Sequence, residues 1–347
     1  MRKSLYIMLA LLTLVVFSDV KAGNPDRQGE AGAYELVINP WGRSSGLHSL
    51  NTASVMGVEA IRLNVAGLSF INNTEIIAAT TQYLRGTEIS VNAVGLAQKI
   101  GKNGVFGVSL MAMDFGDISI TTVQQPEGNG GIFSPNYTNL GLSYAHLFDE
   151  KIAVGVTTRI VSENASDVKA TGVAIDAGIQ YTNENVRIGI SLRNIGTPLR
   201  FEGEGLSTPV TSPNGQTIYT VDQRAARYEL PTVLNLGVSY KFELADQHDL
   251  TAMGNFASNS FSRDEAGVGV EYNFNNIFMA RVGYKTELGL NQNTDIGPSI
   301  YTGLAAGVSL QLALNKDKPE NTVGLDVSYQ ETTTFGGNFN VGLRLAL

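Results

Sequence analysis

Apolar and polar side chains alternate residue by residue through most of the chain after position 73. Between positions 234 and 242, Leu, Leu, Val, Tyr and Phe occupy every second position, and Asn, Gly, Ser and Lys lie between them. The same pattern runs through the final residues of the chain, which end on Leu347. Because successive side chains of a β-strand point to opposite sides, this alternation predicts strands with one apolar face.

About fourteen segments follow this rule, and the alternation is weakest in the first three. Each is about ten residues long, the length of a tilted strand that crosses a membrane. An even number of such strands suits a closed barrel, which leaves no unpaired strand edge in lipid. The predicted strands are residues 74–83, 89–100, 105–115, 138–148, 152–163, 169–181, 186–194, 232–243, 249–260, 265–274, 277–286, 302–313, 322–331 and 337–346.

The connections between the predicted strands support a membrane barrel. Short polar turns, such as 149–151 and 182–185, alternate with connections that are often longer, such as 116–137, 195–231 and 287–301. Outer-membrane barrels have short turns on the periplasmic side and longer loops outside the cell. We therefore predict an all-β protein, an antiparallel transmembrane β-barrel of about 14 strands in the cell outer membrane, with both termini in the periplasm.

A soluble β-sandwich or propeller would also alternate, but its outer face would be rich in Lys and Glu. Here the second face of the strands carries mainly Gly, Ser, Ala and Asn. Charged residues make up 16% of the chain, against about 25% in typical soluble domains. This composition favours a barrel whose apolar face meets outer-membrane lipid.

Aromatic residues cluster near the ends of the predicted strands, as they do at the two interfaces of membrane barrels. These positions predict the edges of the lipid-facing band. The set beside the short turns is Phe148, Tyr181, Phe242, Tyr272, Phe274 and Phe278, and the set toward the long loops is Tyr284, Tyr301, Tyr329 and Phe339.

The start of the chain has the three parts of a secretory signal peptide. It begins with MRK, continues through a short apolar run and reaches the triplet VKA, which fits the small-x-small cleavage rule. We predict a signal peptide at residues 1–22, a leader and plug segment at 23–73, and the barrel at 74–347. A membrane anchor is the alternative for the first segment, although its apolar run is short for a bilayer span.

The charge and cysteine content exclude several classes of protein. The formal net charge is −8 and the chain has no cysteine. A net negative charge gives no reason to expect a nucleic-acid partner. Without cysteine there is no disulfide framework, no Cys-ligated zinc and no attachment of lipid through an N-terminal Cys.

The strand face that would line the lumen combines many glycines with several charges. Glycine within a strand indicates either barrel curvature or the close approach of another segment, and the sequence leaves both open. The inward glycines are Gly141, Gly155, Gly172, Gly178, Gly189, Gly237, Gly267, Gly269, Gly283, Gly303, Gly307, Gly324 and Gly342. The lumen charges are Arg159, Asp176, Arg187, Arg193, Lys241, Glu271, Arg281, Lys285, Asp326 and Arg344.

The segment before the first strand is long for a simple leader. It carries the carboxylates of Asp26, Glu30, Glu35 and Glu59 among small and apolar residues. Because the lumen face carries more arginine and lysine than carboxylate, we expect residues 38–70 to fold into the barrel as a plug with carboxylates facing the lumen arginines.

No catalytic or cofactor chemistry is evident from the sequence. His48, His146 and His248 lack metal-ligand spacing, and neither a G-x-S-x-G elbow nor a dinucleotide loop before a helix is present. We therefore expect no enzyme activity, no metal site and no cofactor, with a hydrolase embedded in the barrel as the open alternative.

The leader also carries a family resemblance. It reads INPWGRSSGLHSLNTASVMGVEAIRLNVAGLSF, and the order of a small-residue stretch, a polar stretch and N-x-A-G-L resembles the hatch of the long-chain fatty acid transporter superfamily. The usual form there is Asn-Pro-Ala-Gly-Leu, and Val65 replaces the proline here. The hatch candidates are Glu59, Asn64, Ala66, Gly67 and Leu68.

Within that superfamily, the stretches GNPDRQGEAGAYELVINPWGRSSG and SLRNIGTPLRF most resemble the PorV/PorQ family. This resemblance implies a fourteen-stranded outer-membrane barrel associated with type IX protein secretion. The implied partners are the translocon or the C-terminal signal domains of secreted cargo. The chain departs from the pattern at Val65 and at its final Leu347, so a paralogue with another partner is also open.

Three functions compete at this stage. An interaction protein of the secretion machinery would use its long loops, where Phe201, Tyr219 and Tyr228 are the candidate partner-binding residues. A transporter of hydrophobic small molecules would hold a lipid or detergent-like ligand in its lumen, which the charged inward face does not favour. A simple porin would have an open lumen and no use for the long leader.

Overall fold

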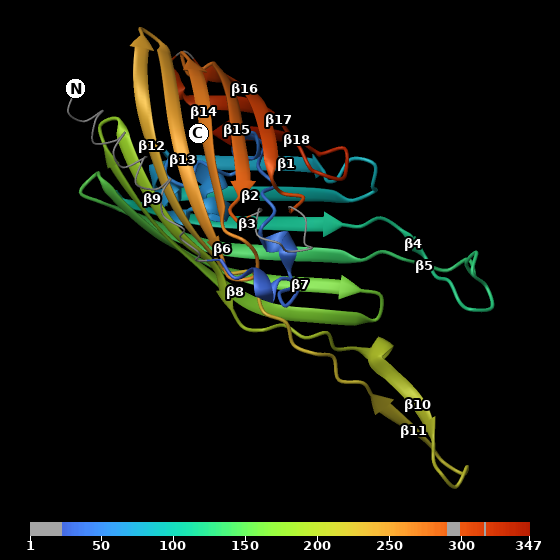
Figure 1. Cartoon of the computed structure of the whole chain (residues 1–347). Coiled ribbons are helices and arrows are strands. Elements are labelled where there is room, and N and C mark those ends of the chain that lie inside the picture. The colour runs from blue at the N-terminus through green and yellow to red at the C-terminus, as the bar shows by residue number, and fades with distance from the viewer. Residues whose placement is uncertain (1–22, 290–298, 316) are drawn as a thin grey trace.

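The computed structural model describes residues 23–289, 299–315 and 317–347. The expected signal peptide at residues 1–22 and the middle of the predicted 287–301 loop lie outside the described residues. Within the described part of the chain, fourteen antiparallel strands close into a barrel (Figure 1). The predicted fold class is confirmed.

The strands pair in chain order, and β1 pairs with β18 to close the ring. All fourteen predicted spans correspond to barrel strands, including the three in which the alternation is weak. The barrel strands are β1 (Thr74–Gln82), β2 (Ser90–Ile100), β3 (Gly104–Asp114), β6 (Asn136–Phe148), β7 (Ile152–Ala165), β8 (Val168–Asn183), β9 (Val186–Gly196), β12 (Val233–Ala245), β13 (His248–Asn259), β14 (Glu265–Phe274), β15 (Phe278–Glu287), β16 (Gly303–Asn315), β17 (Lys318–Gln330) and β18 (Asn338–Ala346).

Two small hairpins extend from the barrel (Figure 1). Strands β4 (Ile118–Ser119) and β5 (Ile132–Phe133) pair within the connection between β3 and β6. Strands β10 (Ser207–Thr211) and β11 (Ile218–Asp222) pair within the connection between β9 and β12. The sequence pattern predicts loops at both places, because these strands are too short to show a clear period.

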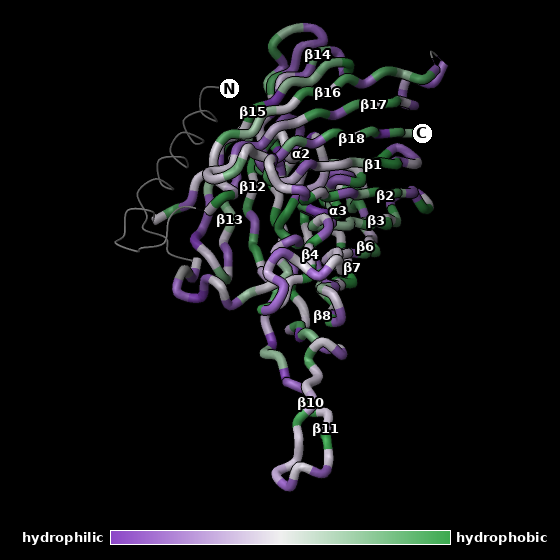
Figure 2. Tube along the Cα trace, turned by 90° about the vertical axis from the view of Figure 1, so that its right-hand side faces the viewer, coloured by the Kyte–Doolittle hydropathy of each residue, from purple (hydrophilic) through white to green (hydrophobic). Residues whose placement is uncertain are grey.

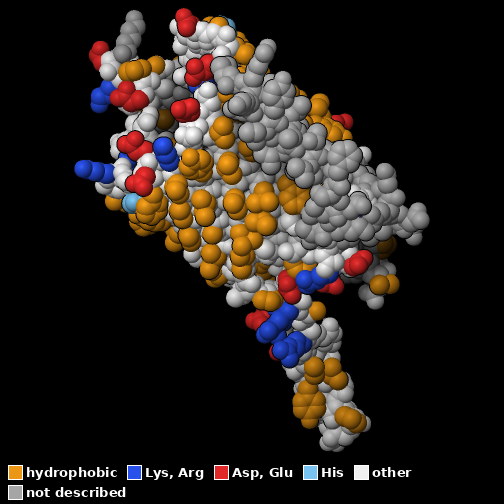
Figure 3. Space-filling view, turned by 60° about the vertical axis from the view of Figure 1, so that its left-hand side comes forward, with side chains coloured by type: hydrophobic (Ala, Val, Ile, Leu, Met, Phe, Trp, Pro, Cys, Tyr) orange, Lys and Arg blue, Asp and Glu red, His pale blue; other side chains and the backbone are white. Residues whose placement is uncertain are grey.

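The outer wall of the barrel is apolar. Along β2, for example, the side chains of Val94 and Leu96 are exposed, whereas those of Val91 and Ala93, nearer the start of the strand, are buried. The tube in Figure 2 alternates between hydrophobic and hydrophilic along the strands, and Figure 3 shows the hydrophobic side chains gathered over the wall. Such a surface is stable only against lipid, because a soluble protein rarely exposes so large an apolar patch.

One of the predicted interfacial aromatics lies elsewhere. Tyr301 is not on the outer wall but inside the loop end of the barrel, where its hydroxyl accepts a hydrogen bond of 2.6 Å from the Tyr83 hydroxyl. Its position two residues before β16 predicts a strand-end residue. The chain turns inward at this point, which alternation within the strand does not indicate.

The connections define two ends of the barrel. The short turns lie at one end, together with the pairing of Thr74 and Leu347, and we call this the turn end. The long connections lie at the other, which we call the loop end. The described N-terminal residues lie at the loop end, where the amide of Asn24 donates to the carbonyl of Asn259. The two ends of the described chain therefore lie at opposite ends of the barrel, which differs from the expectation of both termini on one side.

The physical reason for this difference is the path of residues 31–73, which run through the lumen from the loop end to the turn end before entering β1. The segment contains only short helices, seen within the barrel in Figure 1. None of the helices in the described residues is long and apolar enough to span a membrane. The helices of the segment are η2 (Tyr34–Leu36), α2 (Gly42–Ser45), η3 (Gly57–Glu59), α3 (Ala60–Leu63) and η4 (Val65–Phe70).

Glycines of the wall lie close to atoms of residues 31–73, which we call the lumen segment. A Cβ built on Gly178 would lie 2.0 Å from Oδ1 of Asn64, and one on Gly189 would lie 2.4 Å from the carbonyl oxygen of Thr52. Of the two explanations for the inward glycines, close approach therefore holds at these positions. The same relation holds at Gly155, Gly237, Gly267, Gly283 and Gly307.

We predict that Gly189→Ala loosens the lumen segment, because the new methyl group meets backbone atoms that cannot rotate away. The expected cost is about 1–3 kcal/mol. Gly324→Ala is the matched control, since its Cβ would have no neighbour nearer than 3.6 Å. Trp41 is the single tryptophan of the chain and is buried in the segment. Its fluorescence during urea titration in detergent should show an earlier transition for Gly189→Ala alone, and equal midpoints for the two variants would contradict the prediction.

Candidate functional site

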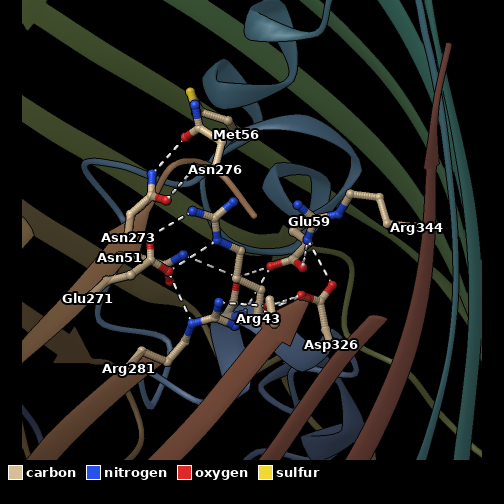
Figure 4. A network of polar contacts seen from close by, with 12 residues as sticks. Arg43, Asn51, Met56, Glu59, Glu271, Asn273, Asn276, Arg281, Asp326 and Arg344 are labelled. Atoms are coloured by element: carbon tan, nitrogen blue, oxygen red, sulfur yellow. Dashed lines mark hydrogen bonds and ion pairs between the residues drawn. The ribbon is translucent and has the colours of Figure 1, made fainter. Parts of the chain in front are cut away.

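A charge network fastens the lumen segment to the wall (Figure 4). Arg43 of α2 forms an ion pair of 2.7 Å with Glu271 of β14. Arg281 of β15 lies 3.0 Å from the same carboxylate. One carboxylate thus receives an arginine from the segment and another from the wall.

Glu59 forms the second half of this network. Its Oε1 accepts from Arg344 of β18 at 2.7 Å, and its Oε2 accepts from the amide and the hydroxyl of Ser44. Arg344 also lies 3.1 Å from Asp326 of β17. Three arginines therefore face three carboxylates, so no charge of the network is buried without a partner of opposite sign.

Further along the barrel, wall arginines bind the backbone of the lumen segment. Arg159 of β7 forms a 2.8 Å ion pair with Asp176 and also donates to the carbonyl of Ile61. Arg193 of β9 donates to the carbonyl of Arg62 at 2.7 Å. These bonds satisfy carbonyl groups that the short helices leave unpaired.

The Asn-Val-Ala-Gly-Leu stretch forms a tight buried corner. The side chain of Asn64 donates to the carbonyls of Thr52 (3.0 Å) and Ile179 (3.1 Å), and its oxygen accepts from the amide of Ala66 at the start of η4. A Cβ on Gly67 would lie 2.1 Å from the carbonyl oxygen of Val55. Ala66 and Leu68 are fully buried. These hatch candidates therefore form one packed unit against the wall.

Two carboxyl groups meet at the loop end of the segment. Glu35 is buried, and its Oε1 accepts from the side chain of Asn139 at 3.2 Å. Burial, with the Glu163 carboxylate next in importance, raises the pKa of Glu35 to about 7. Glu163 of β7 accepts a hydrogen bond from the hydroxyl of Tyr228. The lumen segment, the barrel wall and the connection between β9 and β12 therefore meet at this point.

The structure separates the remaining sequence candidates from these contacts. Lys241 pairs with Asp249 near the turn end, and Arg187 contacts the sulfur of Met56 at 3.4 Å. Lys285 pairs with Glu265 at 2.9 Å. Within the leader, Glu30 pairs with the neighbouring Arg27 rather than with a lumen arginine, and Asp26 is exposed.

Sequence reasoning missed the arginines of the lumen segment. Arg62 donates to the carbonyls of Ile38 and Glu35 and to Asn139, and Arg43 supplies one third of the positive charge in the network. Both stand in the leader among small and apolar residues. Their placement in such a stretch was a usable signal, because an arginine within a buried segment needs partners nearby.

The loop end carries the candidate partner-binding residues. Phe201 and Tyr228 pack against each other, with ring centroids 5.9 Å apart, beneath the β10–β11 hairpin. Together with Tyr34, Phe115 and Tyr137 they line a mostly apolar cavity of about 520 Å³. Tyr219 lies apart from them on the hairpin itself, where 56% of it is exposed.

The described residues contain no group of three or more His, Cys, Asp or Glu side chains that could hold a metal ion.

We predict that Glu59→Lys opens the lumen, because it places a third positive charge beside Arg43 and Arg344 and leaves the Ser44 amide without its acceptor. Loss of one partner from a buried pair costs about 3–5 kcal/mol. Single-channel recording in a planar bilayer should show a higher conductance. Glu184→Lys, on the exposed β8–β9 turn, is the control with the same charge change. Unchanged conductance of Glu59→Lys would count against the role of this contact.

The pKa of Glu35 predicts a pH-dependent stability. Its folded pKa of about 7 lies above its ordinary value, so the folded state binds more protons than the unfolded state between pH 4.5 and 7. Stability should therefore fall by about 2 to 3 kcal/mol from pH 5 to pH 8. Urea midpoints followed by Trp41 fluorescence measure this change.

Glu35→Gln should remove most of this pH dependence. Glu30→Gln, which changes an exposed carboxyl group of the leader just before the lumen segment, should keep it. A slope that is the same in both variants would mean that other groups cause the dependence.

Comparisons with known proteins agree with this architecture. The structure resembles the CymD monoaromatic hydrocarbon channel at 15% identity and a TM-score of 0.57, with 90% of this chain and 97% of that chain covered. It also resembles the toluene transporter TodX of Pseudomonas putida (13% identity, 89% and 97% covered, TM-score 0.54). The toluene transporter TbuX of Ralstonia pickettii is similar to the same degree (14% identity, 89% and 98% covered, TM-score 0.53). At such identities the likeness concerns the fold alone.

The sequence comparisons give the family. No curated protein matches the chain. A family model described as type IX secretion system membrane protein PorP/SprF matches residues 118–344, well over half of the chain. The predicted link to type IX secretion is thus confirmed at the level of this family, whereas the finer PorV/PorQ assignment stays a prediction. The chain belongs to the PorP/SprF family of type IX secretion system membrane proteins.

Proposed function

We propose that this protein is an outer-membrane component of the type IX secretion machinery that binds a partner protein at its loop end. In this proposal the loop end faces the outside of the cell and the lumen segment closes the barrel. The partner is a translocon subunit or the C-terminal signal domain of a secreted protein. Family membership carries the proposal, and the geometry of the loop end supports it.

The β10–β11 hairpin supports a protein partner. Cross-strand neighbours share a face, and the pairings Thr208–Val221 and Val210–Tyr219 put three large apolar groups on one side. Val210, Tyr219 and Val221 are each about half exposed. The hairpin projects away from the barrel and shows hydrophobic side chains near its tip (Figure 3). As a two-stranded sheet it also offers open edges to which a partner strand can add.

The lumen contacts support a closed barrel rather than a porin. The segment buries Trp41, Ile61 and Leu68 against the wall, and its charges are matched by wall charges. A solvated channel would gain nothing from so many paired and buried groups. The segment is therefore proposed as a structural plug that leaves the loops as the functional surface.

We expect Val210→Asp with Val221→Asp to abolish partner capture, because charges on the apolar face of the hairpin oppose its burial in an interface. The measurement is an affinity pull-down from detergent-solubilised outer membrane, followed by mass spectrometry. Thr211→Asp with Thr220→Asp is the matched control, since these residues lie on the opposite face of the same two strands.

Secretion subunits or signal domains should be captured by the wild type and by the control, and lost with the apolar-face variant. Capture of the same proteins by all three forms would remove the hairpin from the proposal. A barrel that is isolated alone, with lipid or hydrocarbon bound, would overturn the secretion role.

That last outcome would favour the second candidate, a transporter of hydrophobic small molecules. The fold likeness to channels named for monoaromatic hydrocarbons and toluene supports this candidate. The apolar cavity at the loop end, lined by Phe115, Tyr137 and Met113, supports it as well. The paired charges deeper in the lumen oppose it, because a hydrocarbon would have to pass through them.

A further inference from the structure

The two hairpins of the loop end stand on pairs of aromatic residues that line one cavity. Phe115 and Tyr137 flank the β4–β5 hairpin in the sequence, and their rings meet edge to face with centroids 4.8 Å apart. Phe201 and Tyr228 flank the β10–β11 hairpin in the same way, with centroids 5.9 Å apart. All four rings line the mostly apolar cavity of about 520 Å³. The cavity therefore lies between the bases of the two hairpins.

The β4–β5 hairpin exposes apolar side chains, as the β10–β11 hairpin does. Val123, in the connection between its strands, is fully exposed, and Ile118 and Ile132 are 41% and 61% exposed. Both hairpins project from the loop end of the barrel (Figure 1). Exposed apolar groups that gather in this way mark a surface at which another molecule binds.

The apolar groups of the β10–β11 hairpin are not a continuation of the lipid-facing wall. Charged side chains lie between the wall and the apolar tip of the hairpin (Figure 3). Arg224 and Arg227, which follow β11 in the chain, are both exposed, and Glu202, before β10, pairs with Arg200. Charged side chains destabilise a barrel where they face lipid. The hairpin therefore presents its apolar face outside the bilayer, where a protein is the partner that fits it.

Neither hairpin alone is large enough to hold a protein. A stable interface buries about 800 Å² on each partner, and each hairpin offers only a few large apolar side chains that are exposed. The two hairpins and the cavity between them together provide a wider surface. Its apolar centre is surrounded by polar and charged groups, which is the usual arrangement of a protein interface.

The cavity offers a place for an anchoring side chain of the partner. Large apolar or aromatic side chains that enter a pocket lose their contact with water completely, and such anchors contribute most of the energy of an interface. Glu35 and Glu163 also line the cavity, but they accept hydrogen bonds from Asn139 and Tyr228. The remaining lining is mostly apolar, so water would find few partners there.

We propose that one partner protein binds both hairpins at the same time and inserts a large apolar or aromatic side chain into the cavity between them. This mode of binding rests on the proposed function, because it describes how the partner from the secretion machinery is held. It goes further in requiring the β4–β5 hairpin and the cavity in addition to the β10–β11 hairpin.

Photocrosslinking in living cells tests the proposal with the full-length protein. Benzoylphenylalanine is placed at Val123 of the β4–β5 hairpin or at Ile218 of the β10–β11 hairpin, both of which are exposed. Mass spectrometry should identify the same secretion protein in both adducts. Benzoylphenylalanine at Ile188, on the lipid-facing side of β9, is the control and should give no adduct with that protein.

Charging one hairpin should weaken crosslinking from the other, because one partner needs both. Ile118→Asp with Ile132→Asp should reduce the Ile218 adduct about tenfold or more, as expected for the loss of strong interface contacts. Ser119→Asp with Gln124→Asp is the matched control, since it adds the same charge at exposed polar positions of the same hairpin. The control should leave the Ile218 adduct unchanged.

The reciprocal variant is Val210→Asp with Val221→Asp, which should reduce the Val123 adduct to a similar extent. Ile89→Trp narrows the cavity and should reduce the adducts from both hairpins. Ile188→Trp makes the same change on the lipid-facing wall and should leave both adducts unchanged. Heat-modifiable migration in gels shows which variants are folded, and the hairpin variants decide the outcome if Ile89→Trp does not fold.

Three results overturn the proposal while the proposed function stands. They are different proteins in the two adducts, an Ile218 adduct that the charged β4–β5 hairpin leaves unchanged, and unchanged adducts from folded Ile89→Trp. If neither hairpin gives a protein adduct, the proposed function is overturned as well.

Discussion

The fold depends on a close approach between two backbones. The lumen segment has little regular structure, and its short helices leave many amide and carbonyl groups without internal partners. Those groups must be satisfied within the barrel, so the chain has to lie against the wall within hydrogen-bond distance. Glycines such as Gly178 and Gly189 make this contact possible, because any side chain there would occupy the position of segment atoms. The wall is thus shaped for its own N-terminal segment.

Charge gives the contact its specificity. Arg43 and Glu59 of the segment meet Glu271 and Arg344 of the wall across long sequence separations. The segment and the wall each contribute one positive and one negative partner to these pairs. The charges are therefore paired only when the segment lies against the wall. Glycine permits the approach, and the ion pairs determine which part of the segment lies at which strand.

Much of this could be predicted from the sequence, for physical reasons. A strand between lipid and lumen must alternate, so β12 and β18 could be located to within a residue or two and the barrel class followed. The lumen contacts were less accessible. Glu59 could be predicted as a carboxylate facing an arginine-rich wall. The partners of Arg43 and Arg62 could not, because they lie as far as 228 and 77 residues away in the sequence and no local pattern identifies them. The β10–β11 hairpin was missed because strands of five residues are too short to show a period. The position of Tyr301 depends on a turn into the lumen, which no local pattern records.

The pairing of β1 with β18 has a consequence for assembly. The lumen segment leads directly into β1 at the turn end, while its beginning lies at the loop end. When β1 and β18 join, the segment becomes a thread held inside a ring. It can then leave only lengthwise, with every contact along its path sliding past the wall. The same holds for entry, so a segment that is not in place when the seam closes has to slide past the whole wall to reach its position.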